Sequence, residues 1–252
     1  MTQIDDMPGP TDPYAPPPLA WRLGIAFCAA VLIAFFTYAF LKHHKFFQNI
    51  CREGGIVENG QFLAFLATSG IAGWVAFRSL HQRDYAVALP YTVFAMGCFV
   101  IAGEEICWGQ RILDYVLPER LLAINAQNEA TFHNIKSIQK KLFHIYALVA
   151  GYGCLSSIAL LVPALRKHRL VRYYAAHPVC FAYFFPALAY GCIRIAYGPY
   201  WRRLQRNFGQ QLAKQASILQ EPVELGIALG FILIAVVALL NKKAERRDQV
   251  DQ

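Results

Sequence analysis

The sequence predicts an all-α integral membrane protein, a bundle of about six transmembrane helices. Of its 252 residues, 56% are hydrophobic and only 16% are charged, whereas a soluble domain usually has roughly 25% charged residues. The apolar residues also form runs about as long as a bilayer is thick, since ~30 Å of hydrocarbon needs roughly 20 helical residues. Six runs have this length, at 22–41, 61–80, 86–103, 142–165, 178–199 and 223–241.

This pattern divides the chain into three parts. Residues 1–20 hold six prolines and are expected to form a flexible tail, because proline disrupts helices. Residues 21–241 form one membrane domain, and residues 242–252 a polar, basic C-terminal tail. The first apolar run continues to Lys42 without a small-residue cleavage site, which predicts a retained helix rather than a signal peptide.

The net charge of +8 does not indicate nucleic-acid binding. Basic residues stand at the predicted helix ends, for example at Lys42, 166–169 and 242–243, where such side chains meet lipid head groups. Membrane lipid is therefore the expected partner, and nucleic acid is not. Basic residues are shared almost evenly between the two sides, so the pattern does not fix the orientation. The seven cysteines include no C-x-x-C pair and are interpreted as small hydrophobic residues.

Two adjacent acids, Glu104 and Glu105, end the third apolar run. A charged side chain deep in lipid costs ~2.5–3.5 kcal/mol on insertion scales, so it persists only with a partner or a purpose. On a continuing helix, Glu104, Trp108 and Arg111 would share one face, and Arg111 could neutralise Glu104. The alternative is that both acids lie at the interface and are simply solvated.

After Pro118 we expect an interfacial or re-entrant helix near 118–136, since proline suits a first helical turn. On such a helix Asn125, Glu129 and His133 would form a polar stripe at i, i+4 and i+8. A Glu and a His one turn apart can ligate a metal, or they can act as a general base and its orienting carboxylate. A lone Glu-x-x-x-His is a weak signal, because any surface helix can show it.

Further acids open two of the apolar helices: Glu58 precedes the second run and Glu224 opens the sixth. Their ordinary interpretation is that carboxylates at helix N-termini complement the helix dipole. Counting crossings, however, puts both on the same membrane side as the end of the third run, where they would converge with Glu129 and His133. Arg194, inside the fifth run near the same end, is expected to pair with an acid.

We therefore predict one polar site at a single membrane face. The predicted catalytic residues are Glu104, Glu105, Glu129 and His133. The predicted substrate-binding residues are Trp108, Gln110, Arg111, Asn125 and Arg194. The predicted metal ligands are Glu58, Glu105, Glu129, His133 and Glu224. Carboxylate and imidazole ligands suit a divalent Zn, Fe or Mn ion, which would lower the pKa of a bound water.

The segments EGGIVENGQ, EEICWGQR, NEATFHN and EPVEL resemble those of a group of bacterial multipass membrane proteins of unassigned function. The resemblance implies a bacterial inner (cytoplasmic) membrane location and no particular activity. CAAX-type intramembrane proteases also use a Glu-Glu pair followed by Arg, but Arg111 stands two residues too far from the acids, and their Phe-x-x-x-His and His-x-x-x-Asn elements are absent. Ceramidase-like membrane hydrolases have a spaced C-terminal histidine pair that this chain lacks.

Three functions fit these patterns. The preferred one is a metal-assisted hydrolase or lipid-modifying enzyme. The alternatives are not enzymatic: a proton-coupled transporter, or a structural or assembly subunit held together by its polar cluster. A transporter ranks lower because it needs a polar path across the membrane, whereas the acids gather near one face. No G-x-x-x-x-G-K-[ST] motif indicates nucleotide binding.

Overall fold

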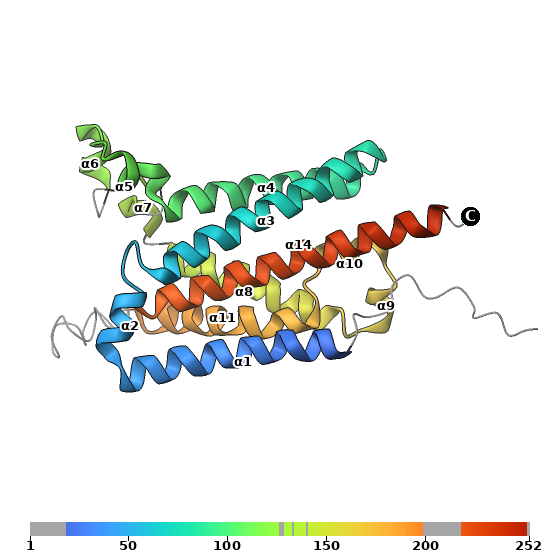
Figure 1. Cartoon of the computed structure of the whole chain (residues 1–252), viewed down its shortest axis with the longest axis horizontal. Coiled ribbons are helices and arrows are strands. Elements are labelled where there is room, and N and C mark those ends of the chain that lie inside the picture. The colour runs from blue at the N-terminus through green and yellow to red at the C-terminus, as the bar shows by residue number, and fades with distance from the viewer. Residues whose placement is uncertain (1–18, 126–128, 133, 140, 199–217, 251–252) are drawn as a thin grey trace, which may run out of the picture.

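The computed structural model describes residues 19–125, 129–132, 134–139, 141–198 and 218–250. Within them the predicted all-α fold is confirmed (Figure 1). Six segments are long and apolar enough to cross a membrane. Five are spanned by α1 (Leu19–Lys42), α3 (Ile56–His81), α4 (Tyr85–Glu105), α8 (Leu142–Ala159) and α14 (Gln220–Val250). The remaining one, Arg169–Ala196, combines α10 (Arg169–Tyr174), η2 (Pro178–Cys180) and α11 (Phe181–Ala196).

Several helix ends differ from the apolar runs. The helix α3 begins at Ile56, five residues before its predicted run, so Glu58 lies in its first turn. The helix α8 ends at Ala159, and Pro163 starts the separate helix α9 (Pro163–Arg166), because proline cannot continue a helix. The helix α14 continues to Val250, so most of the predicted C-terminal tail is helical. Residues 1–18 of the predicted N-terminal tail lie outside the described residues.

The helices pack as a layered bundle. The helices α3 and α4 form a hairpin, α14 packs against α3 and α11, and α11 packs against α8. Phe184, which is fully buried, fills the junction of α8, α11 and α14. Gly153 and Gly230 make room for it, since a Cβ there would lie 2.3 Å and 2.6 Å from its ring. The helix α1 lies at the edge of the bundle beside α2 (His44–Ile50) and α11, and most of its side chains are exposed, as expected for a lipid-facing helix.

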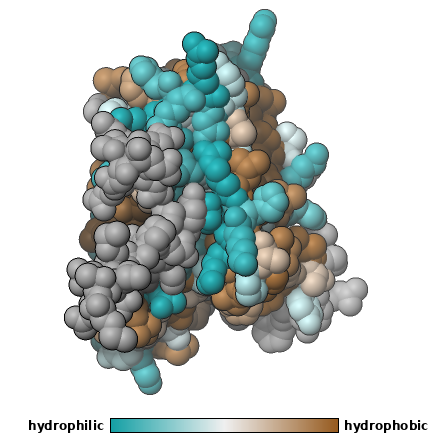
Figure 2. Space-filling model, turned by 90° about the vertical axis from the view of Figure 1, so that its right-hand side faces the viewer, coloured by the Kyte–Doolittle hydropathy of each residue, from teal (hydrophilic) through white to brown (hydrophobic). Residues whose placement is uncertain are grey.

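The two ends of the bundle differ in character. One end holds the start of α3, the end of α4 and the start of α14, and beside it lie α5 (Gln110–Leu113), α6 (Glu119–Ile124) and α7 (Lys136–Gln139) (Figure 1). We call it the acidic end, because the start of α3, the end of α4 and the start of α14 carry Glu58, Glu104, Glu105, Glu221 and Glu224. The opposite end holds the α3–α4 turn, α9, α10 and the end of α14. Figure 2 views this opposite end, where hydrophilic residues gather with hydrophobic surface on both sides.

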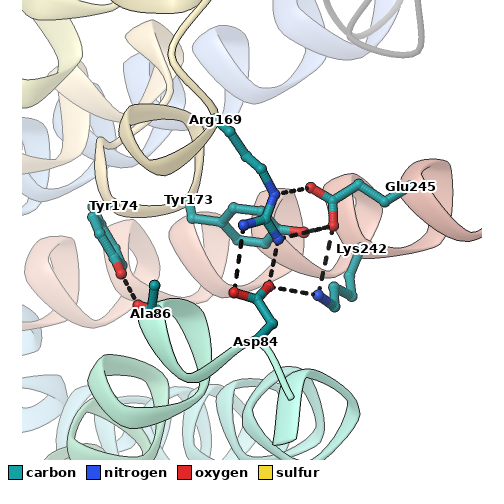
Figure 3. A network of polar contacts seen from close by, with 7 residues as sticks. All are labelled: Asp84, Ala86, Arg169, Tyr173, Tyr174, Lys242 and Glu245. Atoms are coloured by element: carbon teal, nitrogen blue, oxygen red, sulfur yellow. Dashed lines mark hydrogen bonds and ion pairs between the residues drawn. The ribbon is translucent and has the colours of Figure 1, made fainter. Parts of the chain in front are cut away.

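An ion-pair cluster of Asp84, Arg169, Tyr173, Lys242 and Glu245 lies at the opposite end (Figure 3). The Arg169 guanidinium binds Asp84 and also Glu245, with Nε 2.7 Å from Oε1 of Glu245. The Lys242 Nζ lies 3.0 Å from Oδ2 of Asp84 and 3.5 Å from Oε2 of Glu245. The Tyr173 hydroxyl donates to Glu245 over 2.9 Å. The cluster thus joins the start of α4, α10 and the end of α14.

The helix expected near 118–136 is shorter in the structure, where α6 covers Glu119–Ile124. The helix α6 ends at Ile124, and Asn125 pairs with Ile135 in an isolated antiparallel bridge. The Asn125 amide donates to the carbonyls of Glu129 (2.7 Å) and Thr131 (3.2 Å). Such side-chain bonds to nearby backbone compete with helix formation. Asn125 and Glu129 therefore do not share a helical stripe, and His133 lies outside the described residues.

The helix α4 ends at the Glu-Glu pair and does not continue past it. The helix α4 ends at Glu105, and Cys107, Trp108 and Gly109 follow in 3-10 helix η1 (Cys107–Gly109) with φ of 49°, 50° and 80°. Backbone in this left-handed region cannot extend an α-helix. Glu104, Trp108 and Arg111 therefore do not lie along one helix face. The Arg111 side chain lies outside the described part of the chain.

Candidate functional site

The chain reversal after α4 gives Glu104 two hydrogen bonds. Its Oε1 accepts from Nε1 of Trp108 and its Oε2 accepts from the backbone N–H of Phe132, both over 2.6 Å. The Trp108 ring folds back onto Gly103, where a Cβ would lie 2.8 Å from the ring. Glu104 is buried, with 7% of its surface exposed. This predicted catalytic carboxylate therefore fixes the loop at 129–132 against the end of α4.

Polar side chains hold that loop from three further positions. The Gln110 side-chain oxygen accepts from the backbone N–H of Ala130 over 2.5 Å. Asn125 donates to two loop carbonyls, as described above, and the Asn134 amide donates to Oε2 of Glu129 over 3.0 Å. Three of the predicted site residues, Gln110, Asn125 and Glu129, are thus brought together. Asn125 and Gln110 shape the loop through its backbone.

The loop and the η1 reversal enclose a pocket of about 360 Å³, which we call the interfacial pocket. Three predicted site residues line it: Trp108, Asn125 and Glu129. The other lining residues are Tyr115, Leu117, Ile124, Ala130, Thr131, Phe132 and Ile135. The Thr131 hydroxyl is buried and has no hydrogen-bond partner among the described residues. A buried polar atom without a partner is rare in a folded protein and calls for an explanation.

A second group of polar side chains is the acid cluster, which Glu105 forms with Glu58, Glu104, Glu221 and Glu224. All four of these carboxylates interact electrostatically with Glu105, which is partly buried. The members come from the start of α3, the end of α4 and the start of α14. Like charges brought together in this way repel one another when ionised. Of the predicted metal ligands, Glu58 and Glu224 are thus close enough to Glu105 to interact with it electrostatically.

Neutral groups donate hydrogen bonds to three of these acids. Glu224 accepts hydrogen bonds from the Tyr146 hydroxyl and from the Gln220 amide, the latter over 2.9 Å. The Gln61 amide, fully buried, donates to the backbone carbonyl of Glu221 over 2.8 Å and to its carboxylate over 3.3 Å. Glu58 accepts from the backbone N–H of Gly54 just before α3. These bonds tie α3, α8 and α14 together at the acidic end.

The predicted site residue Arg194 lies in the last turn of α11. Arg194 stacks over the rings of Phe143 (4.3 Å to the centroid) and Tyr190 (5.7 Å). Its Nη1 lies 3.5 Å from the Tyr190 hydroxyl. The side chain of Arg111 and all of His133 lie outside the described residues.

No metal centre is formed within the described chain, since no group of three His, Cys, Asp or Glu residues there could hold an ion.

Near the acid cluster, Cys51 is a buried thiol. Burial, with a further contribution from Glu221, raises its pKa to about 12. Cys51 is therefore a protonated thiol at neutral pH, as its interpretation as a small hydrophobic residue requires.

Sequence analysis missed four residues at the interfacial pocket and the acid cluster: Gln61, Thr131, Tyr146 and Gln220. Gln61 stands at the start of an apolar run, and a polar residue there is itself a functional signal that could have found it. Thr131 has no such signal. Its importance comes from the loop that buries its hydroxyl, and that loop depends on contacts with α4 and α5.

Together these features define the class: an α-helical, multipass membrane protein with a polar site at one end of its bundle. Comparison with protein families, with curated proteins and with solved structures finds no match to this chain.

Proposed function

We propose that the chain is a membrane-embedded hydrolase or lipid-modifying enzyme of the bacterial inner membrane, with its active region at the acidic end. The observation that supports this most is the position of Glu105 beside four other carboxylates at one end of a membrane bundle. The repulsion that these carboxylates exert on Glu105 is relieved when Glu105 takes up a proton. A carboxyl group that exchanges protons in this way is suited to general acid–base catalysis.

Glu105 and Glu129 would carry out the acid–base chemistry, Glu105 from the acid cluster and Glu129 from the interfacial pocket. Glu129 lines the interfacial pocket, where a substrate can bind. Glu104 accepts from Trp108 and from the loop backbone, so it acts as a positioning residue in this proposal. Arg111 and Arg194 would hold an anionic substrate group.

The metal-assisted form of the proposal requires His133 to complete a centre with Glu105, Glu129, Glu58 or Glu224. Zn, Fe or Mn would suit these ligands. Elemental analysis of the purified protein tests this form directly. A stoichiometric metal that is lost in His133→Ala supports it, and lipid turnover by metal-free protein contradicts it while leaving the acid–base form intact.

A non-enzymatic assembly role is the second candidate, and one observation favours it. Glu104 and Glu224 accept hydrogen bonds from neutral donors on other segments, which is what a structural polar contact would provide. In that case the acids at this end would contribute to stability, and replacing them would destabilise the bundle.

The test of the enzymatic proposal is lipid turnover in nanodiscs made with a bacterial lipid extract and followed by mass spectrometry. We expect some lipid species to be consumed by the wild type and Glu105→Gln to slow this by at least ~100-fold, the scale of general acid–base catalysis. Glu119→Gln is the matched control, because Glu119 is exposed in α6 at the same end. A wild type that consumes no lipid, or equal rates for the two variants, would contradict the proposal.

A further inference from the structure

We propose that a groove between α1, α11 and α14, which we call the lateral groove, binds one anionic phospholipid. The acyl chain of this lipid fills the groove, and its phosphate contacts Arg194. The inference rests on the proposed function only for the role of Arg194, and it does not require that the lipid is consumed. Three observations support it: an apolar groove between membrane-spanning helices, a groove length that matches one leaflet, and a cation beside the groove.

The first observation is the composition and position of the lateral groove, which has a volume of about 410 Å³. It is lined by residues between 29 and 41 of α1, between 182 and 193 of α11, and between 219 and 229 at the start of α14. Among the described lining residues none is charged, and the polar ones are Thr37, Tyr183 and Tyr190. Ile33 and Leu41 on the α1 wall are 46% and 68% exposed. Because all three helices are long and apolar enough to cross a membrane, the hydrocarbon of the bilayer can enter this groove.

The second observation is the length of the groove. It ends at Ala29, which is 2% exposed, and one turn beyond it the Tyr183 hydroxyl donates to the carbonyl of Ile25 over 3.1 Å. From Ala29 to Leu41, at 1.5 Å per residue, the groove is ~18 Å long. One leaflet is half of the ~30 Å hydrocarbon core, or ~15 Å. The groove therefore suits the acyl chain of one leaflet, whereas a spanning helix of a second copy would need the full width.

The third observation is the charge beside the groove. Arg194 lies in the last turn of α11, and its Nη1 is 3.5 Å from the hydroxyl of Tyr190, which lines the groove. A guanidinium is suited to binding phosphate, and basic side chains at helix ends attract anionic lipid head groups. The carboxylates of Glu221 and Glu224 do not line the groove and accept hydrogen bonds from side chains of α3 and α8. The end of the groove near Arg194 therefore favours a negatively charged head group.

Photolabelling in nanodiscs tests this site. The probe is a phosphatidylglycerol with a diazirine in its acyl chain, compared with a phosphatidylcholine probe that has the same chains, each at low amount in an unlabelled phosphatidylcholine bilayer. We expect the anionic probe to label residues 29–41 and 182–193 about fivefold more than the zwitterionic probe, the effect of one basic side chain close to an anionic lipid. Labelled peptides are mapped by mass spectrometry.

Replacing Arg194 tests the phosphate contact. Arg194→Gln should lower labelling by the anionic probe to the level of the zwitterionic probe. Arg78→Gln is the matched control, because Arg78 is likewise half-buried and stacks over an aromatic ring, that of Trp74, but lies in the last turn of α3 at the opposite end. Equal labelling by the two probes in the wild type, or an anionic preference that survives in Arg194→Gln, would overturn the inference.

Filling the groove tests the position of the acyl chain. Ala189→Phe fills it from α11, and Thr37→Phe fills it from the exposed α1 wall, so both should remove the anionic preference. Ala34→Phe is the matched control, because Ala34 is exposed on α1 and does not line the groove. A preference that survives both filling variants would exclude the groove as the site. Crosslinks between two copies of the chain at groove residues, in place of lipid labels, would assign the groove to a second copy and overturn the inference as well.

Glu105→Gln keeps this inference apart from the proposed function. Glu105 does not line the groove, so this variant should keep the anionic preference. An anionic preference without any lipid turnover would leave the binding site standing and remove the proposed function, while turnover without an anionic preference would do the reverse.

Discussion

Replacing Arg169 with Gln should destabilise the bundle by about 2–3 kcal/mol. Arg169 binds Asp84 and Glu245 at once, and without it these two carboxylates share only Lys242. Breaking a buried ion pair costs ~3–5 kcal/mol, whereas exposed pairs contribute ~0–1 kcal/mol. The two carboxylate side chains are 14% exposed, but the Arg169 side chain is 39% exposed. Solvent screening therefore places the cost between the two limits.

The free energy of unfolding, measured by SDS titration in mixed micelles, gives the cost. Lys243→Gln is the matched control, because Lys243 is exposed on α14 next to the cluster residue Lys242 and should change stability by less than ~0.5 kcal/mol. A double-mutant cycle with Asp84→Asn should show a coupling of at least ~1 kcal/mol, as expected for contacting charges. A cost below ~0.5 kcal/mol for Arg169→Gln, or a coupling near zero, would refute the reasoning.

The same cluster predicts how stability depends on pH. Burial raises the pKa of Asp84, but hydrogen bonds from Arg169 and Lys242 outweigh this and hold the pKa below its usual 3.8. A lowered pKa in the folded state means that the stabilisation is present above about pH 4 and is lost as the pH falls through the folded value. The wild type should therefore lose more stability between pH 7 and pH 3 than Asp84→Asn. Equal losses would show that Asp84 is not held by its partners.

Two further predictions concern packing and the loop. Gly230→Ala should cost about 1–3 kcal/mol through overpacking, because its Cβ would lie 2.6 Å from the Phe184 ring; Gly97→Ala, with open space at that position, should not be destabilising. Trp108→Phe removes the N–H that donates to Glu104, so hydrogen exchange at the backbone of 129–132 should become faster by about tenfold, as the loss of ~1 kcal/mol or slightly more implies. Unchanged exchange would show that this bond does not hold the loop.

The sequence was sufficient for the six spans, because bilayer thickness fixes the length that an apolar run needs. It placed helix ends less well, since an end depends on local contacts. The helix α4 stops at Glu105 because Cys107 and Trp108 adopt positive φ. Cysteine and tryptophan are not residue types that indicate positive φ in a sequence. Only Gly109, the residue that tolerates such backbone best, gave a hint.

The gathering of acids at one end of the bundle could be predicted from the sequence. The separation of the interfacial pocket from the acid cluster could not. Helical spacing placed Asn125 and Glu129 on one stripe, whereas the structure joins them through a side-chain bond to backbone within a loop. Glu104 and Glu105 are neighbours in sequence, yet Glu104 accepts a hydrogen bond from the loop at 129–132, whereas Glu105 interacts with other carboxylates. The basic residues Arg169 and Lys242 were interpreted as head-group contacts, because their acidic partners lie too far away in the sequence to be paired by pattern.

The contrast between the two ends of the bundle leads to the prediction that separates an enzymatic from a structural role. At the ion-pair cluster each carboxylate binds a cation, so those acids contribute to stability. Glu105 differs: in the described part of the chain its interactions are the repulsive ones with other carboxylates, and no side chain donates a hydrogen bond to it. Glu105→Gln removes one of the repelling charges and keeps the shape of the side chain. Its free energy of unfolding should therefore equal or exceed that of the wild type, within ~0.5 kcal/mol on the low side, while Arg169→Gln falls clearly below. A loss of more than ~1 kcal/mol in Glu105→Gln would mean that this carboxylate holds the bundle together, and the structural role would then be the better explanation of the acidic end.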